Sequence, residues 1–277
     1  MEYGVRSCFG KLRRVLMHRP SEELQLVTDP SSWGFKARPN WQEAGEEFDA
    51  LVDVLKAENV SVELIDVGSD VPPPNLYFTR DLGLCTTNGL LLANFRTEYR
   101  QGEELFLQFM SDSLDIPVFG RIMHGYLEGG DIEFVSDRVV AIGLNYRTNQ
   151  EGFEQACEFL DEVVFPVIHD KETHLNSIFS MVDVDLALVY ESALSKEFLT
   201  FLSGNNIETV SLGYQQQSRF GADILRLEAD KVVMCGDCDK LSFDLEKRGV
   251  DVIPVKMDEL KKGFGGPGSL ALSLLRD

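Results

Sequence analysis

Four loop-like segments of the 277-residue chain hold residue types that can catalyse proton transfer and nucleophilic attack. Asp81 follows a run of three prolines, and Glu128 and Asp131 flank a Gly-Gly pair whose tight turning lets both carboxylates face one ligand. His174 lies in the third segment, where a histidine is a candidate general acid or base. Ser269 follows a glycine-rich segment and starts an apolar stretch, which is a nucleophile-like position. Each segment alone also fits an ordinary polar turn, so the chemistry depends on whether the fold brings the four together.

A recurring unit of amphipathic helix, short polar turn and apolar strand must position these loops. Five copies span residues 44–67, 102–120, 151–169, 194–213 and 239–255. In the first helix, Phe48, Leu51 and Leu55 recur at three- and four-residue steps, which is the helical period. Further strand candidates lie between the units, at 13–18, 89–95, 138–144, 186–190 and 231–235, with a last one at 269–275.

Such units cannot bury their apolar faces alone, so we expect five of them in a ring, forming a single α/β domain over residues 1–277. An open doubly wound sheet is the alternative, but no GxGxxG follows the first strand and the units look equivalent. In a ring of repeats, loops from all units converge on a central pit, which is where a ligand would bind.

The charge balance argues against one class of partner. Asp and Glu total 46 against 26 Lys and Arg, which gives a net charge of −20 and a pI near 4.6. An acidic surface repels phosphate backbones, so we expect no nucleic-acid partner. No stretch approaches the ~18 apolar residues of a membrane span, and the N-terminus lacks the apolar region of a signal peptide. We therefore expect a cytoplasmic protein without membrane contact, and the sequence leaves open whether it forms a homo-oligomer.

The chain has five cysteines, an odd number that predicts free thiols in a protein without a secretion signal. Cys235 and Cys238 have the CxxC spacing of a redox or zinc pair. No second pair of Cys or His at ligand spacing accompanies them, and they follow an apolar strand. We favour a turn between a strand and a helix over a redox or metal function.

Five short motifs follow one another in a fixed order. They are FTRD at 78–81, LEGGD at 127–131, NYRT at 145–148, HLNS at 174–177 and GGP at 265–267. Their order resembles the guanidino-modifying enzymes, which include arginine deiminases, dimethylarginine dimethylaminohydrolases, citrulline hydrolases and arginine amidinotransferases. The resemblance runs from residue 16 to the C-terminus. It implies the pentein fold, a five-bladed pseudo-symmetric α/β propeller, which agrees with the five units.

The resemblance also implies roles for the charged residues of these motifs. Asp81 and Glu128 match the carboxylates that hold the guanidinium nitrogens, a pairing that the planar group favours, and Asp131 supports the same site. His174 matches the general acid/base that protonates the leaving amine. Glu128 and His174 would therefore be catalytic together with residue 269.

Further positions match the walls and the anchors of the family's pocket. Arg147, and less certainly Arg100 or Arg96, match the clamps for the substrate α-carboxylate. Asn75 and Phe78 match residues of the pocket wall. Family members need neither a metal nor an organic cofactor, so we expect none here.

The family reaction uses a cysteine thiolate, which attacks the amidine carbon, expels an amine and forms a covalent intermediate. This chain has Ser269 at the matching position, and a serine hydroxyl reacts poorly without a dedicated base. Three explanations remain open: an engineered replacement of cysteine, a natural loss of activity, and either a working serine or a misplaced loop.

A second departure concerns Asn176, two residues after the candidate acid/base. Arginine deiminases have aspartate there, whereas asparagine is neutral and can both donate and accept. It could face a neutral ureido group or a substituted guanidine, which argues against a plain arginine deiminase. The segment 148–150 after Arg147 is similar to the dimethylaminohydrolases.

The sequence therefore predicts a hydrolase that cleaves a C–N bond in the guanidino or ureido group of a small arginine-like substrate. Methylarginine, citrulline and arginine are the candidates. An amidinotransferase, which differs only in its acceptor, and a non-catalytic binding protein on the same fold are the alternatives. A redox protein that uses the CxxC pair is a remote third.

Overall fold

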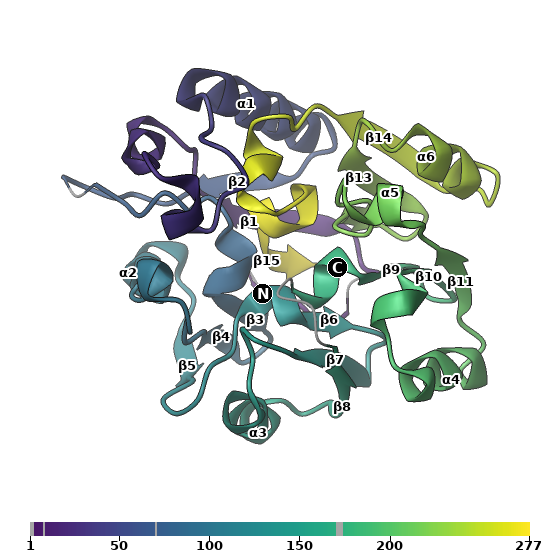
Figure 1. Ribbon diagram of the computed structural model, residues 1–277. Helices are drawn as coiled ribbons and strands as arrows, with labels where there is room; N and C mark the ends of the chain where they lie inside the picture. The colour runs from purple at the N-terminus through teal and green to yellow at the C-terminus, as the bar shows by residue number, and fades with distance from the viewer. Residues whose placement is uncertain (1–2, 8, 70, 170–173) are drawn as a thin grey trace.

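The computed structural model describes residues 3–7, 9–69, 71–169 and 174–277. In this part of the chain, the strands form five three-stranded sheets. Figure 1 shows the sheets arranged around a common centre, with the long helices on the periphery. The five-unit α/β architecture expected from the sequence is thereby confirmed.

Each sheet has the same topology, in which a short first strand is antiparallel to the middle strand and the third strand is parallel to it. The first strands are β3 (Gly83–Thr86), β6 (Ile132–Phe134), β9 (Phe179–Asp183), β12 (Leu225–Glu228) and β15 (Leu272–Arg276). The middle strands are β4 (Gly89–Leu92), β7 (Val139–Leu144), β10 (Leu186–Val189), β13 (Lys231–Cys235) and β1 (Leu12–Met17). The third strands are β5 (Val118–Arg121), β8 (Val163–Ile168), β11 (Glu208–Ser211), β14 (Asp251–Val255) and β2 (Ser61–Leu64).

A helix connects the middle strand of each sheet to its third strand, because parallel neighbours need a crossover. These helices are α2 (Glu104–Leu114), α3 (Gln150–Phe159), α4 (Lys196–Gly204), α6 (Asp239–Glu246) and α1 (Trp41–Ala57), and a short α5 (Tyr214–Gln217) lies outside the pattern. Asn40 caps α1 through its side chain, and the apolar face of that helix is buried. The middle strand β4 is buried along its whole length, as expected for a strand that is covered on both faces.

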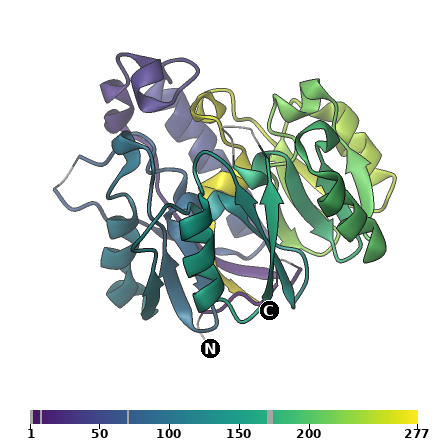
Figure 2. The ribbon, with the colours of Figure 1, turned by 60° about the horizontal axis from the view of Figure 1, so that its bottom comes forward.

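The first and last parts of the chain share one sheet. Strand β15 pairs with β1 in antiparallel fashion, with Leu16 opposite Leu272. In Figure 2 the yellow C-terminal strand lies beside the purple N-terminal strand. The unit that β1 begins is therefore completed only by the C-terminal residues.

Four of the five first strands are preceded by a short 3₁₀ helix that points toward the centre of the molecule. These helices are η3 (Thr79–Leu82), η5 (Gly129–Asp131), η6 (Leu175–Ser177) and η9 (Pro267–Leu270). The fifth first strand, β12, is preceded by Asp223 at the same two-residue offset at which Asp81 precedes β3. Four of the five motifs thus occupy equivalent positions before a first strand, whereas NYRT follows the middle strand β7.

Two details of the sequence prediction differ from the structure. Strands β6, β9 and β12 were not predicted. Ile132–Phe134 has only three residues, and Leu225–Glu228 alternates apolar with charged residues. The predicted strand at 269–275 starts too early, since Pro267–Leu270 is helical. Among the described residues, no helix is long and apolar enough to cross a membrane.

Replacing Leu274 by alanine tests the placement of β15 in the core. Leu274 is fully buried, whereas Leu64 on the same sheet is 49% exposed. We expect Leu274→Ala to lower the free energy of unfolding by about 2–5 kcal/mol, because it leaves a cavity. The control Leu64→Ala should change it by about 0.5 kcal/mol or less. Chemical denaturation measures both, and equal losses would contradict this placement.

Candidate active site

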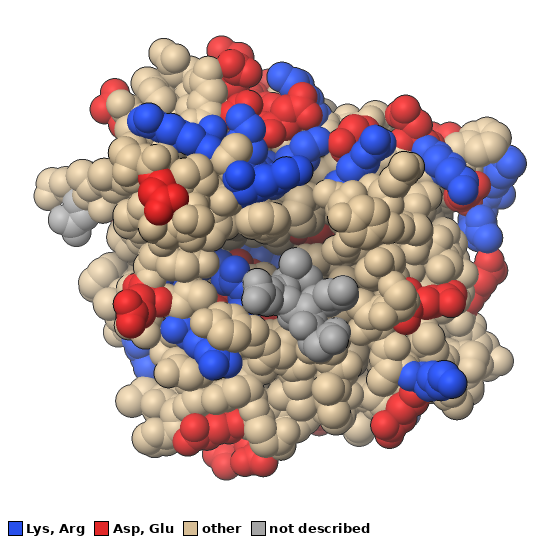
Figure 3. All heavy atoms as spheres, viewed as in Figure 1, with Lys and Arg blue, Asp and Glu red and all other residues tan. Residues whose placement is uncertain are grey.

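A cavity of about 300 Å³ opens near the centre of the molecule. Its lining consists of Ser31, Gly34, Asn75, Phe78, Asp81, Tyr99, Arg100, Arg147, His174, Gly263, Phe264 and Ser269. Seven of the ten residues predicted for the site are in this lining. The space-filling view shows the surface hollowed here, with a Lys or Arg side chain visible inside (Figure 3). The other three predicted residues lie behind the lining. Glu128 contacts His174 and Asn176 contacts Ser269, whereas Asp131 bonds to Leu175, next to His174.

His174 and the carboxylates of Asp81 and Glu128 form a cluster of groups that can exchange protons at the cavity wall. His174 Nε2 lies 2.8 Å from Glu128 Oε2, and its Nδ1 lies 3.5 Å from Asp81 Oδ1. Burial alone would lower the pKa of the imidazole. The negative charges of Asp81, Asp131 and Glu128 outweigh burial and raise the pKa of His174 above its usual value. The histidine is therefore suited to give a proton rather than to take one.

Two arginines hold Glu128 in its ionised form. Arg147 Nη1 lies 3.2 Å from Glu128 Oε2, and Arg100 Nη1 lies 3.6 Å from the same oxygen. Burial alone would raise the pKa of this carboxyl, but Arg147, His174 and Arg100 together lower it to about 2. Glu128 is a carboxylate throughout the physiological pH range and can pair with a cation.

Arg100 does not have the surroundings expected of a carboxylate clamp. Its guanidinium is buried and lies 2.7 Å from both Asp81 Oδ2 and Glu103 Oε2. Arg96, the other alternative, stacks at 4.0 Å on the ring of Tyr146 and is absent from the cavity lining. Arg147 remains the partly exposed guanidinium in the lining, with 18% of its side chain accessible.

Acceptor atoms without a partner surround the cavity. Asp81 Oδ1, Glu128 Oε1, Asn176 Oδ1 and Asn75 Oδ1 are buried and have no hydrogen-bond partner among the described residues. Buried polar atoms are normally paired, so four such acceptors together indicate a ligand that is rich in N–H groups. A guanidinium offers five donors in one plane.

Asp131 supports the loops behind this wall. It accepts hydrogen bonds from Thr148 Oγ1 at 2.6 Å, from Asn145 Nδ2 at 2.7 Å and from the Leu175 backbone at 2.9 Å. Burial raises the pKa of Asp131 to about 6. Its three donors come from the NYRT and HLNS motifs, so this carboxyl joins two units at the site.

Asp223 belongs to the site although the sequence analysis missed it. Its Oδ2 accepts a hydrogen bond from Ser269 Oγ at 2.6 Å, and Asn176 Nδ2 lies 3.0 Å from both Asp223 Oδ1 and Ser269 Oγ. Asp223 is fully buried. The one signal in the sequence was its position before β12, which matches that of Asp81 before β3, but β12 itself was not predicted.

The four described cysteines are absent from the lining of this cavity. Cys235 ends β13 and Cys238 caps α6, so the CxxC segment is the turn between a strand and a helix. Burial raises the pKa of the Cys238 thiol to about 11 and that of Cys235 well above its usual value. Neither thiol is a reactive thiolate at neutral pH. Cys8 lies outside the described residues.

One group of side chains has the spacing of a metal site. Asp81, Glu128 and His174 each offer a ligand atom, and these atoms lie within 4.8 Å of one another. A divalent ion would concentrate two charges beside Arg100 and Arg147, whereas a guanidinium spreads a single charge over three nitrogens. The electrostatics therefore favour an organic cation at this position.

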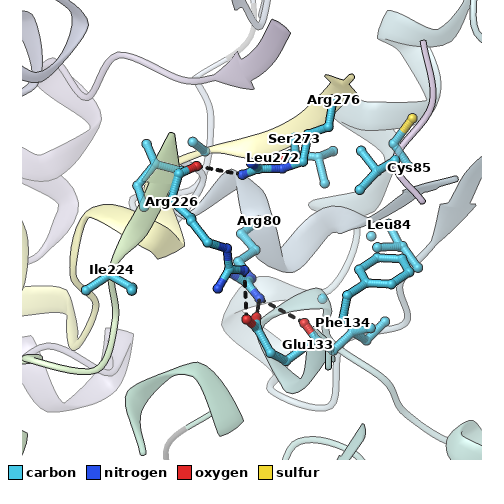
Figure 4. Close-up of a pocket in the computed structure, with 16 residues that line it drawn as sticks. Arg80, Leu84, Cys85, Glu133, Phe134, Ile224, Arg226, Leu272, Ser273 and Arg276 are labelled. Atoms are coloured by element: carbon cyan, nitrogen blue, oxygen red, sulfur yellow. Dashed lines mark hydrogen bonds and ion pairs between the residues drawn. The ribbon is translucent and has the colours of Figure 1, made fainter. Parts of the chain in front are cut away.

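A second, smaller cavity of about 60 Å³ is lined by the first strands of several units and is drawn in Figure 4. Arg80 and Arg226 lie 2.6 and 2.9 Å from opposite oxygens of Glu133, and Arg276 donates to the backbone oxygen of Arg226. Arg80 of the FTRD motif thus pairs with Glu133 rather than with its neighbour Asp81. We read this cluster as a charge-balanced connection between units.

The raised pKa of His174 makes stability depend on pH. A charged imidazole stabilises the fold fully below its unfolded pKa of about 6.5, and this contribution is lost as pH rises through the folded value. The stability advantage of the native chain over His174→Gln should therefore shrink as the pH rises above about 6.5. Thermal unfolding at a series of pH values measures it. The exposed His124→Gln control should follow the native curve, and a constant difference for His174→Gln would refute the assignment.

Solved structures share this architecture. The N-terminal domain of ArgZ, an arginine dihydrolase from cyanobacteria, superposes with a TM-score of 0.83 at 20% identity, covering 95% of this chain and 97% of that one. A dimethylarginine dimethylaminohydrolase gives a TM-score of 0.76 at 21% identity over 95% of this chain and 100% of that one. For AgrE the TM-score is 0.84 at 21% identity, but the chain spans only 39% of its length. These likenesses confirm the pentein fold.

Curated sequences point the same way. The uncharacterized protein YkgA of Bacillus subtilis is 25% identical over 275 residues, covering 98% of this chain and 94% of that protein. An arginine deiminase of Limosilactobacillus reuteri is 25% identical over 256 residues, covering 74% of this chain and 62% of that enzyme. The family model described as N,N dimethylarginine dimethylhydrolase, eukaryotic, matches residues 30–269. Since this match includes every motif of the cavity and Asp223, the chain belongs to the dimethylarginine dimethylaminohydrolase family of amidine hydrolases.

Proposed function

We propose that the protein hydrolyses a C–N bond in the guanidino group of a free arginine-like amino acid. The observation that carries this proposal is the pair of buried acceptors without a hydrogen bond, Asp81 Oδ1 and Glu128 Oε1, beside the imidazole of His174. A planar cation with several N–H groups satisfies those acceptors and neutralises the carboxylates. The cavity of about 300 Å³ matches a ligand the size of an amino acid.

Each catalytic step has a candidate residue. Asp81 and Glu128 orient the guanidinium so that its carbon faces Ser269, which occupies the nucleophile position. The hydroxyl oxygen adds to that carbon, and charged His174 gives its proton to the departing amine. Water then releases the product from the covalent intermediate. The reaction so described uses the chain's own groups, and we propose that residues 1–277 act as one catalytic domain.

The other pocket residues bind the remainder of the substrate. Arg147, which is partly exposed in the lining, is the candidate partner of the α-carboxylate. Asn75 and Phe78 form the wall along the aliphatic part. Arg100 also lines the cavity, but its contacts with Asp81 and Glu103 support a role in balancing the charge of these acids rather than in binding the α-carboxylate.

Asn176 favours a guanidino over a ureido substrate. Its Nδ2 group is occupied by Asp223 and Ser269, which leaves the oxygen as the unpaired atom. That oxygen can accept an N–H but cannot donate to a ureido carbonyl. Together with the acidic wall, this supports methylarginine or arginine ahead of citrulline, and the structural relatives include proteins described as acting on dimethylarginine and arginine.

A turnover assay tests the proposal. The native chain and Ser269→Cys are incubated separately with arginine, monomethylarginine, asymmetric dimethylarginine and citrulline, and products are identified by mass spectrometry. We expect citrulline and an amine from a guanidino substrate, and Asp81→Asn should lower kcat/KM by about 10²-fold or more. The exposed Asp137→Asn control should retain activity. Binding without turnover by both nucleophiles would replace the hydrolase by a binding protein.

Chelation separates this chemistry from metal catalysis at the triad of Asp81, Glu128 and His174. We expect kcat/KM to be unchanged after dialysis against EDTA and after addition of Zn²⁺ at micromolar concentration. Elemental analysis of the purified protein provides an independent readout. Activity that disappears with EDTA and returns with one metal would show that the triad holds an ion.

A further inference from the structure

The hydroxyl of Ser269 is held between two side chains that decide where its proton points. Asn176 Nδ2 lies 3.0 Å from Ser269 Oγ and can only donate, so the serine oxygen accepts that bond. The single hydroxyl proton is then directed at Asp223 Oδ2, which lies 2.6 Å away. A second lone pair of the oxygen remains for attack on a ligand in the cavity.

Asp223 is fixed in this orientation by the loop that carries Ser269. The backbone N–H of Gly266 donates to Asp223 Oδ2 at 2.5 Å, and Asn176 Nδ2 holds Oδ1 at 3.0 Å. A Cβ on Gly268 would lie 2.5 Å from Asp223 Oδ1, so the loop wraps the carboxylate as closely as a glycine allows. This geometry leaves the carboxylate little freedom to move away from the serine.

His174, the other candidate base, does not face the Ser269 hydroxyl. The two ring nitrogens of His174 face Glu128 and Asp81, and its raised pKa suits it to donate a proton. Serine needs a partner that removes its proton, since the hydroxyl itself is a weak nucleophile. Asp223 is the ionisable side chain that contacts Ser269 Oγ directly.

We propose that Asp223 is the general base that makes Ser269 a working nucleophile, with Asn176 aligning the pair. This inference rests on the proposed hydrolase function and deepens it. Burial raises the pKa of Asp223 to about 6, which makes it a stronger base than an ordinary aspartate while it stays ionised at neutral pH.

The proton and bond changes balance within the site. As the bond from Ser269 Oγ to the guanidinium carbon forms, the hydroxyl proton passes to Asp223 Oδ2. His174 protonates the leaving amine as its C–N bond breaks, which leaves an O-linked isouronium on the serine. Water then attacks the same carbon. One of its protons restores the charge of His174, and the other is taken up by the released amine, which becomes an ammonium ion. Ser269 takes its proton back from Asp223, and a ureido product departs.

A comparison of two nucleophiles distinguishes a base from a merely structural carboxylate. Asp223→Asn keeps the shape of the side chain and removes the base. We expect it to lower kcat/KM of the serine enzyme by about 10²- to 10⁴-fold. In the Ser269→Cys background the same change should cost less than about tenfold or raise activity, because a thiol ionises more readily and a neighbouring carboxylate disfavours the thiolate. Asp137→Asn is the control in both backgrounds.

Equal losses of kcat/KM in the two backgrounds would overturn the proposal, because a structural role of Asp223 would not depend on whether residue 269 is serine or cysteine. Turnover by Ser269→Cys without turnover by the native chain would also overturn it, while leaving the hydrolase function intact. If every variant is inactive on every substrate, the proposed hydrolase function fails as well. Failure of the Asp223 assignment can therefore be told apart from failure of the hydrolase function.

A second measurement needs no substitution of Asp223. The native chain is treated with a fluorophosphonate, which labels serines that have an activating base, and the modified peptide is identified by mass spectrometry. We expect the label on Ser269 and its suppression by methylarginine. Failure to label Ser269 would count against an activated hydroxyl even if Asp223→Asn does not fold.

Discussion

The pairing of β15 with β1 is the constraint on which the site depends. It brings η9, and with it Ser269, against segments from the first third of the chain. Thr79 connects these segments directly, because its hydroxyl lies 2.9 Å from the Leu16 carbonyl and 2.8 Å from the Leu270 carbonyl. Three distant segments thus meet at one buried hydroxyl, two residues before Asp81. Without this pairing, Ser269 would not share one cavity with Asp81.

The centre of the molecule concentrates charge that an ordinary core would exclude. Burial is costly for each ion, and the paired guanidinium and carboxylate groups offset that cost only in part. The same burial produces different chemistry at different carboxyls, since Glu128 beside two arginines has its pKa lowered to about 2 while that of Asp223 is raised to about 6. Environment therefore separates a permanent anion from a group that can exchange a proton near neutral pH.

Much of the fold could be predicted because most helices and strands have a recognisable local pattern of apolar residues. Helical periodicity identified the helix around Phe48 and Leu51, and apolar runs identified all the middle strands. The charged residues of the motifs were found because each stands in a loop with a recognisable order. Asp223 was missed since it lies in no such motif and precedes a strand with alternating charges. The contact of Arg100 with Asp81 was equally out of reach, because it joins residues of different segments.

By itself the sequence determined the five-unit architecture, the order of the motifs and the acidic and basic residue types available for chemistry. These depend on periodicity and composition, which are local properties of the chain. Only the tertiary structure decided which side chains meet: Ser269 with Asp223, 46 residues away, and Asn176 with its oxygen left unpaired. Hydrogen-bond partners across units are set by how the units pack and by the pairing of the terminal strands. No short-range pattern encodes that arrangement, and the direction of the serine proton follows from it.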